Sequence, residues 1–212
     1  MKKAKMGIDF SMNSAAVCIE RDNEIHFFVF PRSTTKNMDA LLRDTNVHVH
    51  VIEKTKPDDY NSNIATRERF NTRDAMKVST SMIDTLKDFL IGYDVQIGIE
   101  GIAFMSRGNA IAQFSGYHYI LRAALSQITD LDNVVVFQPT TVKKHAGGGR
   151  FKKEDMIDAF MKVKSSQLQE NDFYNRLVNS TDDFKSVRAK NFLKPVDDMV
   201  DSYYVLKCLD IS

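Results

Sequence analysis

The chain has 212 residues, 43% of them hydrophobic, and a formal net charge of +1. This length suits one domain with one core, so we expect a single domain over residues 1–212 rather than two. No apolar run approaches the roughly 18 residues that span a membrane, and Met1–Lys5 leads directly into a strand. We therefore expect a soluble, cytoplasmic protein without a membrane partner. The net charge neither supports nor excludes nucleic acid, because basic residues can cluster locally.

Two cysteines and a pair of histidines are possible metal or redox groups. Cys18 and Cys208 lie in apolar contexts far apart in the sequence, which is typical of buried thiols in a reducing compartment rather than of a disulfide or a zinc site. His48 and His50 alternate with apolar residues, so on a strand they share one face. No neighbouring Cys, Asp or third His completes a metal site, and the exposed face of an edge strand is the preferred interpretation.

The first part of the chain predicts a small antiparallel sheet. An opening strand reaches Asp9, and the segments 15–21 and 24–30 alternate around a polar turn, which predicts a three-stranded meander. Polar, irregular residues follow, and Val47–Ile52 has the pattern of a strand. The region 31–63 therefore looks like an insertion into a simpler core.

The remainder alternates helices with buried strands. Apolar residues recur every three or four positions in the helical segments, and β-branched runs mark the strands. This order predicts an α/β domain with a mixed five-stranded sheet flanked by helices. Residues 165–194 are polar and weakly periodic, and we expect a second insertion or a mobile segment there. The predicted helices are 64–90, 108–128, 140–144, 152–163 and 195–208, and the predicted strands are 95–99 and 134–137.

Acidic residues occupy positions where this fold would bring them together. Asp9 interrupts an apolar run, which is the pattern of a carboxylate displayed at the end of a strand, or of a strand that ends in a solvated turn. Glu100 ends another strand, and sites collect at the carboxyl ends of parallel strands. Asp198 and Asp201, or Asp197 and Asp201, share one face of the last helix. Together these acids would repel one another unless a cation lay between them.

Oxygen ligands favour Mg²⁺, with Mn²⁺ as a substitute, over zinc. Two ions about 3.5–4 Å apart are the usual device for in-line phosphodiester hydrolysis. We therefore expect a magnesium site at this edge of the sheet. Acids in the first turn of the last helix also have a simpler explanation, because negative charges there interact favourably with the helix dipole and stabilise the helix.

Three motifs resemble those of the RuvC family of Holliday-junction resolvases, which have an RNase H-like fold. They are Gly7-Ile8-Asp9, Ile97-Gly98-Ile99-Glu100, and Asp198-Met199-Val200-Asp201. The segments 137–144 and 150–153, around a glycine-rich turn, resemble the lysine-bearing segment of the family. The resemblance implies that Asp9, Glu100, Asp198 and Asp201 are metal ligands and catalytic residues; Asp197 fits the spacing less well. The divergence and the insertions suggest a bacteriophage or similarly remote member.

Basic residues around the glycines are candidate DNA contacts. Glycines let backbone amides approach phosphate, and cations release counterions when DNA binds. A flexible solvated loop would have the same composition. The resemblance places Lys143 or Lys144, and the catalytic candidate Lys153, near the cleaved phosphate, and it makes Phe104 a candidate wedge. The full set of candidate DNA contacts is Phe104, Arg107, Lys143, Lys144, Arg150, Lys152 and Lys153.

The resemblance implies a Mg²⁺-dependent endonuclease that hydrolyses phosphodiesters at four-way junctions. Two symmetric cuts need a two-fold homodimer, and by the family's habit the helix 108–128, with Tyr117 and Tyr119, would form its interface. One alternative keeps the fold and changes the substrate to other branched DNA or RNA–DNA hybrids. A catalytically inactive DNA-binding scaffold is another, against which the complete set of acids argues. A sugar-kinase relative would need a second, duplicated domain, for which the chain is too short.

Overall fold

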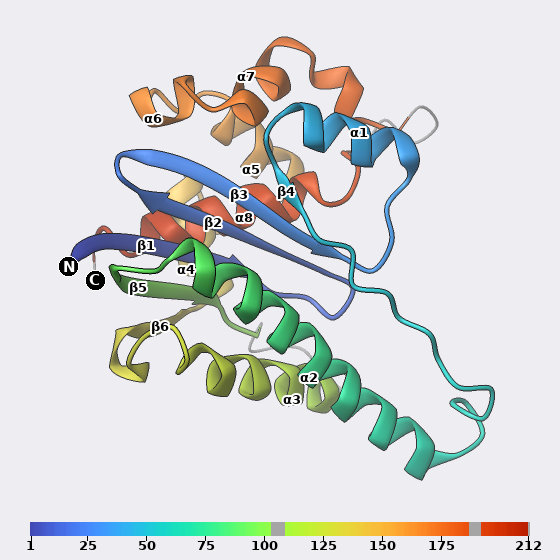
Figure 1. The fold of residues 1–212 in the computed structure, drawn as a ribbon. Helices are drawn as coiled ribbons and strands as arrows, with labels where there is room; N and C mark the ends of the chain where they lie inside the picture. The colour runs from blue at the N-terminus through green and yellow to red at the C-terminus, as the bar shows by residue number, and fades with distance from the viewer. Residues whose placement is uncertain (103–108, 187–191, 212) are drawn as a thin grey trace.

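A computed structural model describes residues 1–102, 109–186 and 192–211. Its centre is a six-stranded mixed sheet in the order β4-β3-β2-β1-β5-β6 (Figure 1). The first three strands form the predicted antiparallel meander, while β5 and β6 run parallel to β1. The strands are β1 (Lys2–Asp9), β2 (Ser14–Arg21), β3 (Glu24–Pro31), β4 (His48–Val49), β5 (Tyr93–Glu100) and β6 (Val134–Phe137).

Helices cover both faces of the sheet. The long helix α2 and its neighbour α3 pack on one face, and α8 crosses the other face with α4 and α5 beside it. Within the described ranges, no helix is long and apolar enough to cross a membrane. The helices are α1 (Lys36–Asp44), α2 (Ile64–Phe89), α3 (Asn109–Leu125), α4 (Pro139–Ala146), α5 (Lys153–Phe160), α6 (Ser166–Gln169), α7 (Asp172–Asn179) and α8 (Val196–Cys208), with short 3-10 turns at Leu131–Asn133 and Thr181–Phe184.

The central strands alternate strictly between the two layers. Ile8 on β1 and Ile97 and Ile99 on β5 are fully buried in the core under α2 and α3. Because successive side chains on a strand point to opposite faces, Gly7, Asp9, Gly98 and Glu100 belong to the face that carries α8. The face that carries Asp9 and Glu100 is therefore the one crossed by α8.

The predicted α/β fold is confirmed, and the differences lie in short elements. The five expected strands are present, and β4 adds a sixth because two residues of the expected segment pair in parallel with β3. Pro31–Thr45, expected to be irregular, contains α1. Residues 165–194 contain α6 and α7, whose Leu168 and Phe173 are fully buried. Helices of four and eight residues are too short to show a clear periodicity in sequence.

A buried ion cluster ties α2 and α3 to the edge of the sheet. Asp74 on α2 accepts hydrogen bonds from Arg32 (2.7 Å) and from the hydroxyl of Tyr117 (2.6 Å), and Lys54 lies 3.2 Å away. Arg32 also donates to the carbonyl of Met12 at 2.9 Å. The cluster thus joins four segments that are far apart in sequence. Cys18 and Cys208 are buried free thiols, as predicted.

Candidate metal centre

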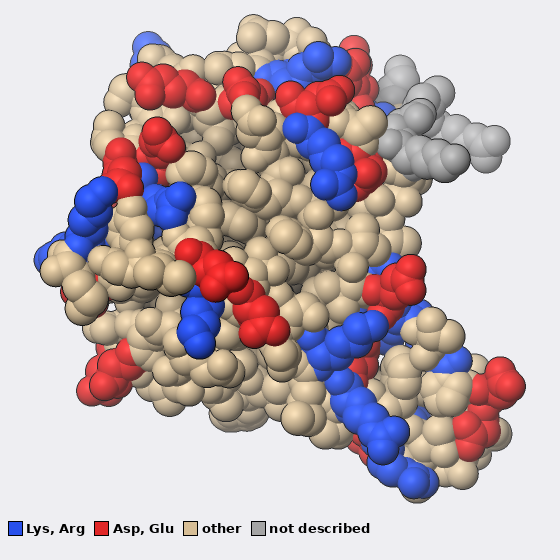
Figure 2. All heavy atoms as spheres, viewed as in Figure 1, with Lys and Arg blue, Asp and Glu red and all other residues tan. Residues whose placement is uncertain are grey.

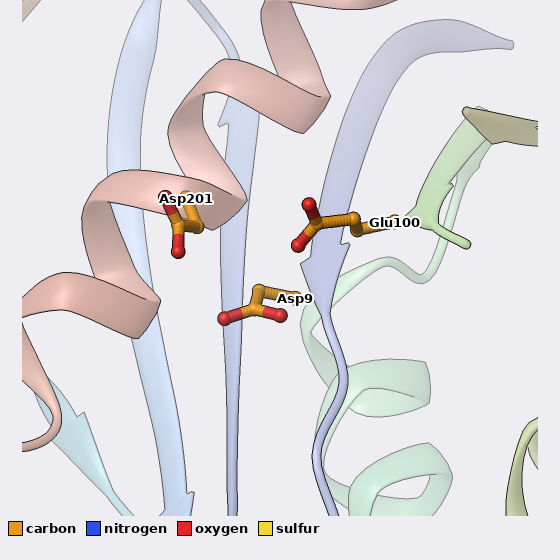
Figure 3. A group of neighbouring side chains, drawn as sticks. All are labelled: Asp9, Glu100 and Asp201. Atoms are coloured by element: carbon orange, nitrogen blue, oxygen red, sulfur yellow. The ribbon is translucent and has the colours of Figure 1, made fainter. Parts of the chain in front are cut away.

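Three carboxylates from three different elements meet at one edge of the sheet. β1 and β5 are in parallel register, with Ile8 opposite Ile99, so Asp9 and Glu100 leave the sheet side by side. Asp201 on α8 completes the group, and one oxygen of each residue lies within 4.8 Å of the others. Figure 3 shows the three side chains directed toward one another. We call these residues the acidic trio.

Two glycines bring α8 close enough to contribute Asp201. A Cβ atom at Gly7 would lie 2.2 Å from the carbonyl oxygen of Ser202 and 2.3 Å from the backbone nitrogen of Leu206. A Cβ atom at Gly98 would meet Val205 at 3.1 Å. Gly7 and Gly98 pair across β1 and β5, so together they form a depression in which the helix backbone rests. Gly7, in the same sequence motif as Asp9, therefore determines how closely α8 packs against the sheet.

Burial and mutual repulsion raise the pKa values of the trio. Burial, followed by the charges of Asp198 and Asp201, raises the pKa of Asp9 well above its ordinary value. Burial also raises the pKa of Glu100, and burial together with Glu100 raises the pKa of Asp201 to about 7. The protein alone thus provides too little positive charge for three ionised carboxylates.

Asp198 and Asp197 lie beside the trio and contact two lysines. Lys194 bonds to Asp198 and lies 3.0 Å from Asp197, while Lys153 bonds to Asp197 and lies 4.0 Å from Asp198. Burial, and then Asp197, raises the pKa of Asp198. Burial works in the same direction on Asp197, but Lys153 and Lys194 lower its pKa overall. Asp197 therefore has its own counter-charges, unlike Asp9.

The acids fit a divalent cation. All of their donor atoms are carboxylate oxygens, the type that hard cations such as Mg²⁺ prefer. The second oxygen of Asp198 and the first of Asp197 are buried without a hydrogen-bond partner in the described part of the chain. Buried polar atoms of this kind are costly unless a partner binds them. The trio, with Asp198 next to it, can therefore hold a metal ion.

The basic candidates on the α4–α5 connection lie at different distances from these acids. Lys153 begins α5 and reaches Asp197, and the charge of Lys143 on α4 acts on Glu100. Lys144, Arg150 and Lys152 are exposed. The fold itself requires glycine at two of the three positions in this connection. Gly147 ends α4 with a φ of +133°, and a Cβ atom at Gly148 would lie 2.6 Å from the Phe151 ring.

Four further residues that the sequence predicted to be functional lie between the end of β5 and the end of α3. Phe104 and Arg107 lie outside the described residues. Tyr119 on α3 is 66% exposed, as an interface residue would be. Tyr117 is 2% exposed and bonds to Asp74, so the expectation that it contributes to a dimer surface is wrong. Its hydroxyl faces α2 because that is where the buried carboxylate lies.

The sequence did not predict the contact of Lys194 with the acids. Lys194 lies two residues before α8 begins, so its spacing of four residues from Asp198 does not by itself place the two side chains together. The packing role of Gly7 was not predicted either, because a strand sequence does not show which helix will cross it.

Comparisons with known proteins support the fold. No family model matches the sequence, and no curated protein matches it. Among solved structures, that of Thermus thermophilus RuvC is similar, with a TM-score of 0.51 and 10% identity over 95% of this chain and 92% of that one. The structure of T. thermophilus RuvC with a Holliday junction substrate has a TM-score of 0.50 and 13% identity, over 96% and 90% of the two chains. At this level of identity the likeness establishes that the chain has a RuvC-like fold.

Proposed function

We propose that this chain is a metal-dependent DNA endonuclease that cuts four-way junctions. The observation that carries the proposal is the acidic trio, which brings Asp9, Glu100 and Asp201 together from β1, β5 and α8. The RuvC-like fold supports it, since one of the similar structures was solved with a Holliday junction substrate. A cytoplasmic location and a bacteriophage source stay predictions.

Each acid has a proposed role in holding Mg²⁺, with Mn²⁺ as a substitute. Asp9, Glu100 and Asp201 would hold one ion, and Asp198 would help to hold a second. When bound, the metal lowers the pKa of a water molecule and offsets charge on the phosphodiester. In the overall reaction the water oxygen adds to phosphorus, one bridging P–O bond breaks, and the departing oxygen takes up a proton.

Basic residues position the DNA in this proposal. Lys153 places its ammonium group beside the acids, where it stabilises the negative charge that develops on the phosphoryl oxygens. Lys143, near Glu100, supports the same phosphate. The remaining proposed contacts to the DNA are Phe104, Arg107, Lys144, Arg150 and Lys152. Paired cuts imply a homodimer, with α3 and the exposed Tyr119 at its interface.

Cleavage assays on a four-way junction, a flap, a linear duplex and an RNA–DNA hybrid test the proposal. We expect Mg²⁺-dependent cutting with the junction as the best substrate, whereas preference for the flap or the hybrid would favour the alternative substrates. Asp9→Asn removes one charged ligand and should lower the cleavage rate by at least roughly 100-fold. The matched control is Asp84→Asn on the exposed face of α2. Parent-like cleavage by a folded Asp9→Asn protein would exclude the metal site.

A further inference from the structure

A row of cations on α2 has no function in the site described above. Arg69, Arg73 and Lys77 are spaced four residues apart and all are exposed. This spacing puts them on one face of the helix, about 6 Å apart along its axis. Figure 2 shows Lys and Arg side chains gathered in a row at the lower right, over α2. Like charges at this spacing repel one another, so the row gives the isolated helix no stability.

No acidic side chain in the described part of the chain pairs with the row. Arg69 donates to the carbonyl of Ala65 at 3.2 Å and Lys77 to the carbonyl of Glu53 at 2.9 Å, so both bind neutral backbone groups. Across the described ranges, no ion pair involves Arg69, Arg73 or Lys77. The nearby acid Glu68 lines a different hollow, between α2 and α3. The charge of the row is thus available to an external anion.

A hollow next to the row adds hydrogen-bond donors. It has a volume of about 400 Å³, lies between α2 and the segment before it, and has no carboxylate in its lining. Hydroxyl and guanidinium groups in one concave surface are suited to phosphate oxygens. These groups come from Thr55, Lys56, Arg69 and Arg73, whereas the hydroxyl of Thr66, which also lines the hollow, donates to Asp59 at 2.8 Å.

The first part of the row, Arg69 and Arg73, projects from the same end of the molecule as the acidic trio. Asp74, which follows Arg73 on α2, bonds to Arg32, which bonds to the carbonyl of Met12, just beyond Asp9. Residues of α2 that precede Asp74 therefore extend past the edge of the sheet where β1 ends, as Figure 1 shows. A duplex arm that extended from the trio past this end of the sheet would meet Arg69 and Arg73.

We propose that Lys56, Arg69, Arg73 and Lys77, the α2 basic stripe, bind the sugar–phosphate backbone of a duplex arm that leads away from the cleaved phosphodiester. The inference rests on the proposed function, which makes DNA the substrate. Contacts of this type carry no sequence information, because the phosphate groups are the same whatever the base sequence. The stripe therefore increases affinity for a linear duplex and for a junction alike.

Equilibrium binding without divalent metal tests the stripe, because no cleavage then occurs. The probes are a fluorescent four-way junction and a linear duplex with the same arm sequence. For Arg69→Gln/Arg73→Gln we expect roughly tenfold weaker binding to both probes, and a slope of log Kd against log salt reduced by about 1.8. The melting temperature should not fall, since neither side chain forms an ion pair.

The matched control removes the same charge from the opposite end of the molecule. Lys3 and Lys87 are exposed and lie where β1 begins and α2 ends. Lys3→Gln/Lys87→Gln should bind both probes as the parent does. Equal losses in the two double variants would indicate a general charge effect and overturn the stripe. Parent-like affinity of Arg69→Gln/Arg73→Gln would overturn it too.

Other outcomes separate this inference from the proposed function. A parent that binds DNA through the stripe but never cleaves supports the inference and refutes the nuclease. A parent that cleaves junctions, with unchanged binding in Arg69→Gln/Arg73→Gln, refutes the inference and supports the nuclease. A parent that binds polyglutamate but no DNA would assign the stripe to an acidic protein partner and overturn the proposal.

Discussion

Asp74 and Asp9 are both buried carboxylates near the same edge of the sheet, but their surroundings differ. Asp74 has two cations and a hydroxyl around it, with Arg32 at 2.7 Å and Tyr117 at 2.6 Å. Asp9 faces two other carboxylates, and its pKa is raised by burial and by their charges. A carboxylate whose partners are built into the fold contributes to architecture. Carboxylates that face one another are suited to a cation from solution.

The largest expected effect is on the free energy of unfolding, and it distinguishes Asp74, which has built-in partners, from Asp9. Asp74→Asn leaves Arg32 and Lys54 buried without an anion, and removing one partner of a buried ion pair costs about 3–5 kcal/mol. Urea denaturation should show this loss whether or not metal is present. Asp84→Asn, an exposed change on the same helix, should stay within about 0.5 kcal/mol of the parent. A parent-like midpoint for Asp74→Asn would remove the distinction between the two carboxylates.

Metal addition should produce the next largest effect. Metal binding needs ionised carboxylates, and at a Mg²⁺ concentration of about 100 Kd the native state gains about 2.7 kcal/mol. Asp201→Asn should lose most of this gain, yet without metal it should be at least as stable as the parent, because one repelling charge is gone. Calorimetry with and without Mg²⁺ measures both quantities. Sodium chloride of equal ionic strength is the control, and an equal gain from it would argue against a bound ion.

His118 is a third kind of buried ionisable group, because it is neither ion-paired like Asp74 nor clustered with like charges like Asp9. Burial, followed by the charge of Arg122, lowers its pKa to about 4, and the ring packs against Phe10 and Phe114. A lowered pKa gives stability that is complete above the unfolded value of 6.5 and is lost as the pH falls toward 4.

The pH dependence of unfolding measures this smaller effect. Between pH 6 and 5 the parent should lose up to about 1.4 kcal/mol more stability than His118→Gln, which has no proton to bind. Comparing the two proteins cancels the contributions of the carboxylates, whose raised pKa values act in the opposite direction. Parallel pH curves for the two proteins would mean that His118 is already solvated in the native state.

The sequence predicted the parts of the site that depend on local pattern. Asp9 and Glu100 end buried strands, and parallel strands bring their ends to one edge. Asp201 was predicted to join them from its place near the start of an amphipathic helix. The ion cluster around Asp74 was not predictable, because Arg32, Lys54 and Tyr117 come from separate segments with no common spacing. The contact of Lys194 with Asp198 also depends on the direction in which a flexible side chain turns.

The same distinction applies to the fold. The long strands and α2 have enough repeats for a period to appear, whereas β4 and α6 are shorter than one clear period. The packing of α6 and α7 depends on buried residues such as Phe173, which bind to a surface made by distant strands. Only the assembled sheet shows where that surface lies.

The contact between Gly7 and Ser202 also has a consequence for how the protein is made. Synthesis proceeds from the amino end, so Asp9 and Glu100 leave the ribosome long before Asp201. During that interval the depression at Gly7 and Gly98 has no helix to fill it, and two acids lack their third partner. The acidic trio is therefore complete only after α8 has been synthesised, later than the strands that carry Asp9 and Glu100.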